Sequence, residues 1–214
     1  GSAAGTSSSV EMINCPISQY SVDNGRSACT CIALTGAIMI LRKEPISSGL
    51  LQSMIRKGVE AYQNLGRSVN VEHMSAEEVL LQNSQDFPLQ LASGGVRQGI
   101  LSKDPDHPMG LLSLLGALQQ EDNKVILITK TPETVVICLE NFAIFDSHPR
   151  PQLAASGAYA RIHPSLEDLV LTLTAIVFPH TDLGPDVPEM MAMMYNCFDL
   201  YPLELKTNGK TPDI

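Results

Sequence analysis

One uncharged segment, residues 27–41, constrains the fold of this chain more than any other feature. It reads Ser-Ala-Cys-Thr-Cys-Ile-Ala-Leu-Thr-Gly-Ala-Ile-Met-Ile-Leu and contains no charged side chain and no proline. A helix that is apolar on nearly every side has no face for solvent, so it must lie inside the protein. Asp23, Asn24 and Ser27 are candidate N-caps for it. The segment predicts a buried central helix around which the other elements pack.

Three further segments carry helical patterns. Residues 48–65 place apolar side chains at three- and four-residue spacing with charged side chains opposite, and Gly66 closes the segment. A Ser-Ala-Glu-Glu capping box begins at Ser75, ahead of an apolar run. Residues 109–119 fit another helix. The first half of the chain is therefore predicted to be mainly helical.

Strand patterns dominate the next part of the chain. β-Branched and aromatic runs, separated by polar turn residues, occupy residues 125–129, 134–139, 142–145 and 159–162. Ser165 then opens another helix. This order of helices followed by strands indicates an α+β fold in which helices pack on one side of a mostly antiparallel sheet.

The composition changes at both ends of this region. Residues 1–12 are largely small and polar, begin with a Gly-Ser pair typical of a tag remnant, and are expected to form a flexible lead. Residues 179–214 contain five prolines and four methionines. We expect them to form an arm or linker with at most one short helix, whose methionines serve packing or an adaptable contact surface. Residues 13–178 are thus predicted to be the folded domain.

The charge balance and the cysteines limit the partners and the setting. There are 23 acidic residues against 14 Lys and Arg, a formal net charge of −9, and no basic run exceeds two residues. Nucleic acid is not expected as a partner, because phosphate contacts need clustered basic side chains. No apolar stretch reaches 18 residues, so no membrane span is expected. Five cysteines, an odd number, and no signal-peptide pattern fit an intracellular, cytoplasmic protein.

Cys29 and Cys31 lie at the start of the predicted buried helix. A helix N-terminus stabilises a thiolate through its dipole and its unpaired N–H groups, and the same N–H groups can bind an oxyanion. This is a suitable position for a nucleophilic cysteine. The alternative is that both are ordinary buried cysteines of a core helix.

Asp146 and His148 follow a predicted strand and are two residues apart. On an extended chain their side chains point to the same side, and a carboxylate beside an imidazole fixes its tautomer. A polar turn is the alternative reading, because Asp, Ser and Pro all favour turns. Taken together, an early helix that begins at Cys29 and a strand that ends near a histidine 119 residues later match the chain order of papain-like enzymes.

The remaining candidate groups are weaker. The other histidines are His73, His107, His163 and His180, and they fall in or beside predicted loops or strand ends. Two of them have a nearby acid, Asp106 and Asp182, but those pairs sit among prolines. A zinc site is not favoured, because the Cys-x-Cys pair has no second ligand pair at metal spacing.

Three short motifs, taken in order, resemble one known family. The run Gly-Arg-Ser-Ala-Cys-Thr-Cys-Ile-Ala-Leu at residues 25–34, with Gln19 ten residues before Cys29, is similar to the active-site start of the herpesvirus tegument deubiquitinases. It is closer still to their non-viral relatives, the viral-tegument-like deubiquitinases. Residues 143–148 resemble the Asp-x-His strand of that family, and residues 158–169 resemble the strand and helix that follow it.

The resemblance implies a papain-like catalytic domain at residues 13–178. It assigns Cys29 as nucleophile, His148 as base, Asp146 as the acid that orients the base, and Gln19 as a side-chain N–H donor to the oxyanion. No metal or cofactor is implied. The second thiol, Cys31, departs from the viral pattern and leaves the identity of the nucleophile open.

The resemblance also implies a deubiquitinase, and the protein is expected to be a monomer. The reaction would be thiol-dependent hydrolysis of isopeptide bonds after the C-terminal glycine of ubiquitin, through a thioester, with ubiquitin or polyubiquitin chains as partners. Two alternatives remain. One is a papain-like protease or acyltransferase with another substrate, and the other is an inactive binding module that holds a basic partner.

An enzyme that acts on ubiquitin must accommodate its basic tail, Leu-Arg-Leu-Arg-Gly-Gly. Acidic side chains of the protein are expected to contact the two arginines. The candidates are Asp182 and Asp186 in the predicted arm, and Glu77 and Glu78 at a predicted helix start. Plain surface charge is the alternative for each of them.

Overall fold

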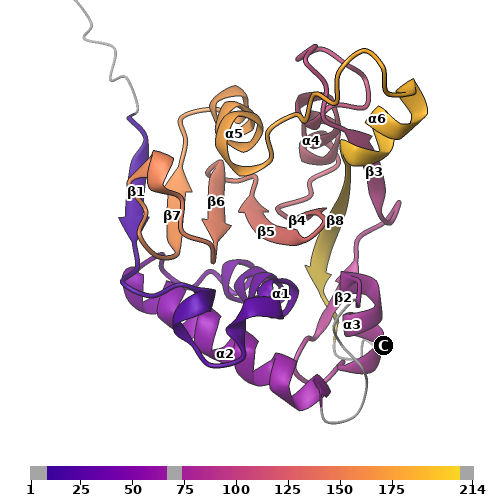
Figure 1. Ribbon diagram of the computed structural model, residues 1–214. Helices are drawn as coiled ribbons and strands as arrows, with labels where there is room; N and C mark the ends of the chain where they lie inside the picture. The colour runs from indigo at the N-terminus through magenta and orange to yellow at the C-terminus, as the bar shows by residue number, and fades with distance from the viewer. Residues whose placement is uncertain (1–8, 67–73, 208–214) are drawn as a thin grey trace, which may run out of the picture.

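An antiparallel sheet forms the centre of the structure, a computed structural model that describes residues 9–66 and 74–207 (Figure 1). Its strands follow the order β1-β7-β6-β5-β4-β8-β2, and β3 also pairs with β8. The strands are β1 Glu11–Asn14, β2 Leu89–Leu91, β3 Arg97–Ile100, β4 Val125–Lys130, β5 Glu133–Cys138, β6 Ala143–Asp146, β7 Tyr159–Ile162 and β8 Cys197–Leu205.

Helices surround this sheet. The α-helices are α1 Cys29–Leu41, α2 Ser48–Gly66, α3 Ala76–Gln82, α4 Leu111–Gln120, α5 Leu166–Thr172 and α6 Glu189–Tyr195. Short helical turns are η1 Gln19–Ser21, η2 Gly25–Ser27, η3 Pro151–Leu153 and η4 Leu173–Val177. The α+β class, with N-terminal helices packed on a mostly antiparallel sheet, is confirmed.

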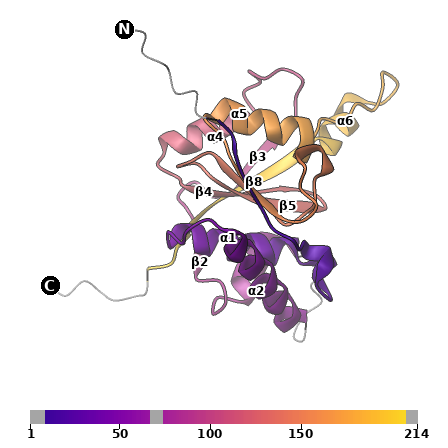
Figure 2. The ribbon, with the colours of Figure 1, turned by 90° about the vertical axis from the view of Figure 1, so that its left-hand side faces the viewer.

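Both faces of the sheet are covered, as Figure 2 shows. The apolar residues of α1, α2 and α3 form one core with one side of the sheet, and those of α4 and α5 form a second core with the other side. Along β4, Val125 and Leu127 face the first core while Ile126 and Ile128 face the second. The expectation of helices on one side only is therefore wrong, because strands that are apolar on both faces need two covering layers.

The predicted burial of the first helix is confirmed. Ala28, Leu34 and Ala37 are fully buried, because α1 lies between the sheet and α2. The two helices approach closely at Gly58 of α2, where an added Cβ would overlap the backbone of Ile32. This tight contact holds the N-terminal end of α1 in place under the sheet.

Most of the other predicted elements are present with small shifts at their ends. The helix predicted at residues 48–65 ends at Gly66, and the strand predicted at residues 159–162 has the same bounds in the structure. Ser75 is the N-cap of α3, and its hydroxyl accepts a hydrogen bond from the backbone N–H of Glu78 at 3.3 Å, which is one of the two bonds of the predicted capping box. Local periodicity and cap chemistry were sufficient for these elements.

The C-terminal segment differs from the prediction. Residues 197–205 do not belong to an arm; they form β8, which lies between β4 on one side and β2 and β3 on the other. Pro202 argues against a central strand, because proline has no N–H for the ladder. The Pro202 carbonyl accepts the backbone N–H of Ala92 at 2.9 Å, so this residue faces the edge of β8 that pairs with β2 and β3. Neither β2 nor β3 has a residue directly opposite Pro202, so the missing N–H falls between the two pairings.

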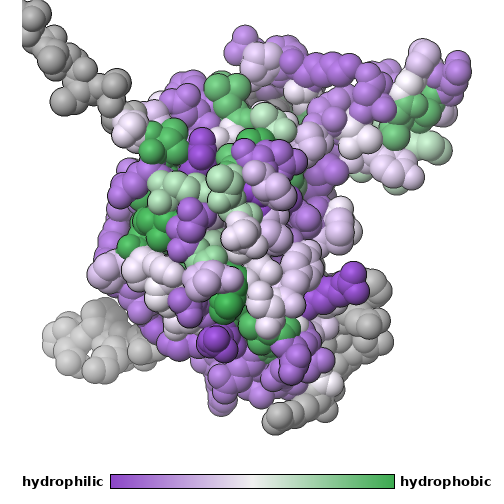
Figure 3. All heavy atoms as spheres, turned by 60° about the vertical axis from the view of Figure 1, so that its left-hand side comes forward, coloured by the Kyte–Doolittle hydropathy of each residue, from purple (hydrophilic) through white to green (hydrophobic). Residues whose placement is uncertain are grey.

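A smaller difference concerns the N-terminal end of the chain. Glu11 and Met12 belong to β1 and not to a flexible lead, and residues 1–8 lie outside the described residues. The one helix expected after residue 178 is α6, which projects from the body of the molecule (Figures 1 and 2). Its methionines are exposed, with Met190 at 76%, and green side chains mark this projecting lobe in Figure 3.

Candidate active site

Cys29 is the first residue of α1, so its side chain lies at the positive end of the helix dipole. The preceding turn η2 leads into the helix through Ala28, and the first turn of α1 contains no acidic side chain that would oppose a thiolate. The Cys29 thiol is 8% exposed and donates a hydrogen bond to the carbonyl of Pro132 at 3.6 Å. It therefore lies beneath the turn between β4 and β5.

Asp146 ends β6, and His148 follows two residues later. The Nδ1 atom of His148 lies 2.6 Å from Oδ1 of Asp146, and the same oxygen accepts the backbone N–H of His148 at 3.0 Å. Both side chains are buried. Because Nδ1 faces the carboxylate, the other ring nitrogen, Nε2, is available for the cleft.

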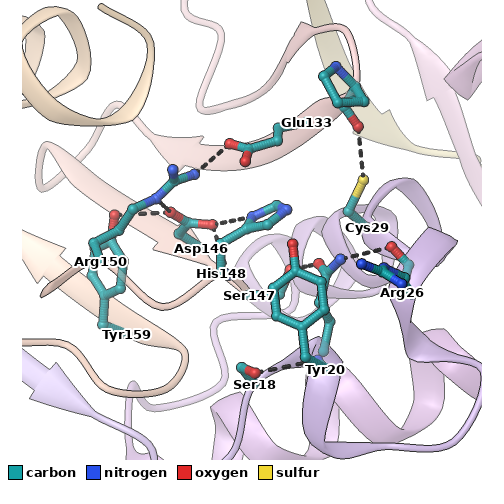
Figure 4. A network of polar contacts seen from close by, with 12 residues as sticks. Ser18, Tyr20, Arg26, Cys29, Glu133, Asp146, Ser147, His148, Arg150 and Tyr159 are labelled. Atoms are coloured by element: carbon teal, nitrogen blue, oxygen red, sulfur yellow. Dashed lines mark hydrogen bonds and ion pairs between the residues drawn. The ribbon is translucent and has the colours of Figure 1, made fainter.

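Two further side chains complete the environment of the carboxylate. Arg150 donates from Nε to Oδ2 of Asp146 at 2.9 Å, and the Tyr159 hydroxyl donates to the same oxygen at 2.9 Å. Arg150 also reaches Oε2 of Glu133 at 2.6 Å. Figure 4 shows this chain of contacts from Glu133 through Arg150 to Asp146 and His148, with Cys29 on the facing helix.

The network lowers the pKa of Asp146 and raises the pKa of His148. Burial alone would raise the pKa of Asp146, but the hydrogen bond and charge of His148, followed by Arg150, hold it below its usual range. Burial alone would lower the pKa of His148, but Asp146 and the nearby Cys29 raise it to about 9. The imidazole is therefore positively charged at neutral pH, with the carboxylate behind it and the cysteine beside it.

Cys31, the competing thiol, has a different environment. It is 2% exposed, and burial, followed by the charges of Cys29 and Asp86, raises its pKa to about 12. Hardly any Cys31 thiolate exists at neutral pH, and the thiolate is the form that reacts. These properties fit a packed core cysteine.

Gln19 is buried at the start of η1, and its amide is held at both ends. Its Oε1 accepts the Ser147 hydroxyl at 2.6 Å, which places Nε2 on the other side, where it donates to the carbonyl of Arg26 at 3.0 Å. An amide nitrogen carries two protons, so one remains for another acceptor. A Cβ at Gly25 would collide with the Gln19 carbonyl, so only glycine fits the turn that brings Gln19 to α1.

A cleft of about 640 Å³ joins these groups. Cys29, His148 and Gln19 line it together with residues from the β4–β5 turn, α3 and β8. The Tyr20 ring stands edge-on to the His148 ring, with centroids 6.1 Å apart, at the border of the cleft. The structure thus brings Cys29, His148 and Gln19 to a single cleft, and Asp146 lies buried behind His148.

The other histidines are engaged elsewhere. Both ring nitrogens of His163 have partners, the Phe142 carbonyl at 2.7 Å and the Thr172 hydroxyl at 2.9 Å. His107 accepts the backbone N–H of Met109 through Nδ1 at 3.0 Å. Asp182, the acid near His180, pairs with Lys103 at 2.8 Å. His73 lies outside the described residues.

Within residues 9–66 and 74–207, no group of three or more His, Cys, Asp or Glu side chains is placed to hold a metal ion. No helix in the same described segments is long and apolar enough to cross a membrane.

Comparison with solved structures places this geometry in a known architecture. The chain is similar to the crystal structure of the ubiquitin-specific protease encoded by a tegument protein of murine cytomegalovirus, in complex with a ubiquitin-based suicide substrate. The TM-score is 0.63 at 13% identity, over 95% of this chain and 89% of that chain. The fold is papain-like. No protein-family profile and no curated protein sequence matches the chain.

Sequence reasoning missed several residues around Asp146 and Gln19. Arg150 and Tyr159 donate to the carboxylate of Asp146, Glu133 pairs with Arg150, and Ser147 holds Gln19. Tyr159 could have been found from strand register, because it is the direct cross-strand partner of Asp146 in the β6–β7 pair. The Glu133–Arg150 contact depends on how the start of β5 and a loop meet in space and has no local signal.

Proposed function

We propose that this chain is a cysteine-type deubiquitinase that hydrolyses isopeptide bonds after the C-terminal glycine of ubiquitin. The observation that carries the proposal is the cleft in which Cys29, at the start of α1, faces a buried His148–Asp146 pair. The likeness in fold to a ubiquitin-specific protease supports the choice of substrate. Cys29 is the nucleophile, His148 the acid and base, Asp146 the orienting acid and Gln19 an oxyanion donor.

In the first half of the reaction, the Cys29 thiolate attacks the carbonyl carbon of the terminal glycine, and a C–S bond forms. The negative charge on the carbonyl oxygen is stabilised by the second Nε2–H of Gln19 and by the backbone N–H of Cys29. As the C–N bond breaks, the Nε2–H of His148 protonates the leaving lysine amine. The products of this half are a thioester on Cys29 and a free lysine side chain.

In the second half, neutral His148 takes a proton from water, and the resulting hydroxide attacks the thioester carbon. The same two donors hold the oxyanion, and the C–S bond breaks to release the ubiquitin carboxylate and the Cys29 thiolate. Asp146 remains ionised throughout, because His148 and Arg150 hold its pKa low despite burial. The raised pKa of His148 keeps the imidazolium available for the first half.

Ubiquitin with a C-terminal electrophile tests the proposal. We expect one covalent adduct, located at Cys29 by peptide mapping, which Cys29→Ala abolishes and Cys31→Ala retains. Cys197→Ala is the matched control, because Cys197 is the exposed cysteine outside the cleft. The same proteins are treated in parallel with a small alkylating reagent, which reports whether Cys29 is reactive on its own.

Three results would contradict the proposal in different ways. Alkylation of Cys29 without any ubiquitin adduct would indicate a papain-like enzyme for another substrate. Failure of Cys29 to react with both the small alkylating reagent and the ubiquitin electrophile would indicate an inactive binding module. An adduct that survives in Cys29→Ala and disappears in Cys31→Ala would shift the nucleophile by two residues.

A further inference from the structure

A row of polar side chains crosses the sheet from β5, next to the nucleophile, over β4 and β8 to β3. Thr134 on β5 is the cross-strand partner of Thr129 on β4, Thr129 is the partner of Asp199 on β8, and Asp199 is the partner of Gln98 on β3. Side chains of directly opposed residues share a face of the sheet. The row starts at the active site, because the hydroxyl of Thr30, the residue after Cys29, lies 3.4 Å from that of Thr134.

Asp199 is the uncompensated charge in this row. It lines the same cleft as Cys29 and His148, and no Lys, Arg or His within residues 9–66 and 74–207 forms an ion pair with it. Burial raises its pKa, which the hydrogen bond from Gln98 only partly offsets. By contrast Glu133, the other acid that lines the cleft, already pairs with Arg150. A partly buried carboxylate without a cation is costly unless a ligand supplies one.

The surroundings of Tyr201 show that this end of the cleft is negative. Burial raises the pKa of Tyr201 to about 12, and the charges of Asp199, Glu77 and Glu78 add to the effect. Arg26 also lines the cleft, at the Gln19 end, where its backbone carbonyl accepts from Nε2 of Gln19 at 3.0 Å. The Asp199 end of the cleft therefore favours a basic peptide segment.

The spacing selects one position of that tail. One strand, β4, lies between Thr134 and Asp199, so two inter-strand spacings of roughly 4.8 Å place them about 10 Å apart. An extended peptide rises about 3.3 Å per residue, so the residue two positions before the scissile glycine has its backbone about 7 Å from it. A long side chain at that position covers the remaining distance. In the tail Leu-Arg-Leu-Arg-Gly-Gly this residue is the arginine before the two glycines.

We infer that Asp199 binds the guanidinium of this arginine and selects a basic residue at that position of the substrate. The inference rests on the proposed deubiquitinase function and replaces two of the sequence-based candidates. Asp182 is paired with Lys103, and neither Asp182 nor Asp186 lines the cleft. Glu77 and Glu78 act on the same end of the cleft from α3. Gln98 holds the Asp199 carboxylate in orientation from β3.

Paired substrates test the inference. Ubiquitin with a fluorogenic C-terminal group is prepared with its native tail and with the arginine before the glycine pair replaced by leucine. We expect Asp199→Asn to lower kcat/KM on the native tail by about tenfold to a hundredfold, the usual size of a hydrogen bond to a charged group, and to change little on the leucine tail. A glutamate at the tail position should recover activity with Asp199→Lys.

The control and the outcomes keep the inference separate from the proposed function. Glu204→Gln neutralises an exposed acid on the same strand, outside the cleft, and should leave both substrates unchanged. Equal losses on both tails, or no loss on the native tail, would overturn the role of Asp199. Failure of the unmodified enzyme on both tails, with Cys29 still alkylated by a small reagent, would overturn the deubiquitinase function, and this inference with it.

Discussion

Removal of a single hydroxyl tests the network behind His148. Tyr159 is fully buried, and its hydroxyl donates to Oδ2 of Asp146 at 2.9 Å. Tyr159→Phe keeps the ring and removes only this donor. A hydrogen bond to a charged group contributes about 1.5–3 kcal/mol, so the free energy of unfolding should fall by about that amount. The matched control is Tyr195→Phe, because Tyr195 is 59% exposed and should change stability by less than about 0.5 kcal/mol.

Urea unfolding at several pH values gives the measurement. Because the pKa of Asp146 is depressed in the folded state, its ionisation stabilises the fold above the ordinary aspartate value of about 3.9, and this stability is lost as pH falls through the lower folded-state value. Tyr159→Phe weakens the ionised state of Asp146. The difference between variant and wild type should therefore be constant from about pH 8 to 5 and shrink only below about pH 4.

Activity gives a second readout of the same change. Arg150 still donates to Oδ2 of Asp146 in the variant, so the carboxylate remains oriented. We expect kcat/KM to fall by less than about tenfold, well short of the loss from removing a triad member. A stability change equal to that of Tyr195→Phe would refute the reasoning, as would a difference that varies between pH 8 and 5.

Three further predictions concern other parts of the site and core. The raised pKa of His148 contributes stability that is complete below its ordinary value of 6.5 and is lost as pH rises through about 9, so unfolding experiments should show this alkaline loss in wild type and not in His148→Asn. Gln19→Ala should lower kcat by roughly 10²–10³-fold while small-reagent alkylation of Cys29 persists, and unchanged turnover would remove Gln19 from the site. Gly58→Ala should lower the free energy of unfolding by about 1–3 kcal/mol in thermal and urea melts, because its Cβ meets Ile32, whereas Gly49→Ala at an open position of α2 should not destabilise.

Elements with a strong local pattern could be predicted closely. The runs at residues 125–129 and 159–162 combine β-branched or aromatic side chains with flanking turn residues, and both are strands. β8 could not be predicted this way. Its proline weakens the local pattern, and the strand is stabilised by partners on β4 that lie about seventy residues earlier in the chain. The local sequence of residues 197–205 does not indicate such long-range strand pairing.

The candidate site also contains residues with a local sequence signal and residues without one. Cys29 at a helix start and the Asp146–His148 pair after a strand carry local signals, since a dipole and a two-residue spacing can be read from short segments. The partners of that pair carry none. Arg150 comes from a loop and Glu133 from the first position of β5, and only the tertiary fold brings the two together beside Asp146. Asp199 of β8 likewise has no local signal and reaches the cleft through the sheet topology.

The amino-acid sequence by itself therefore determined the buried central helix, the main strands of an α+β fold and the candidate nucleophile, base and orienting acid. These depend on periodicity, caps and spacing within about fifteen residues. Only the tertiary structure decided which thiol is deeply buried, which groups set the pKa of His148 and which carboxylate in the cleft lacks a cation. Burial and charge pairing depend on the distances between segments far apart in the chain. These segments come close together only in the folded protein, where the sheet packs against α1.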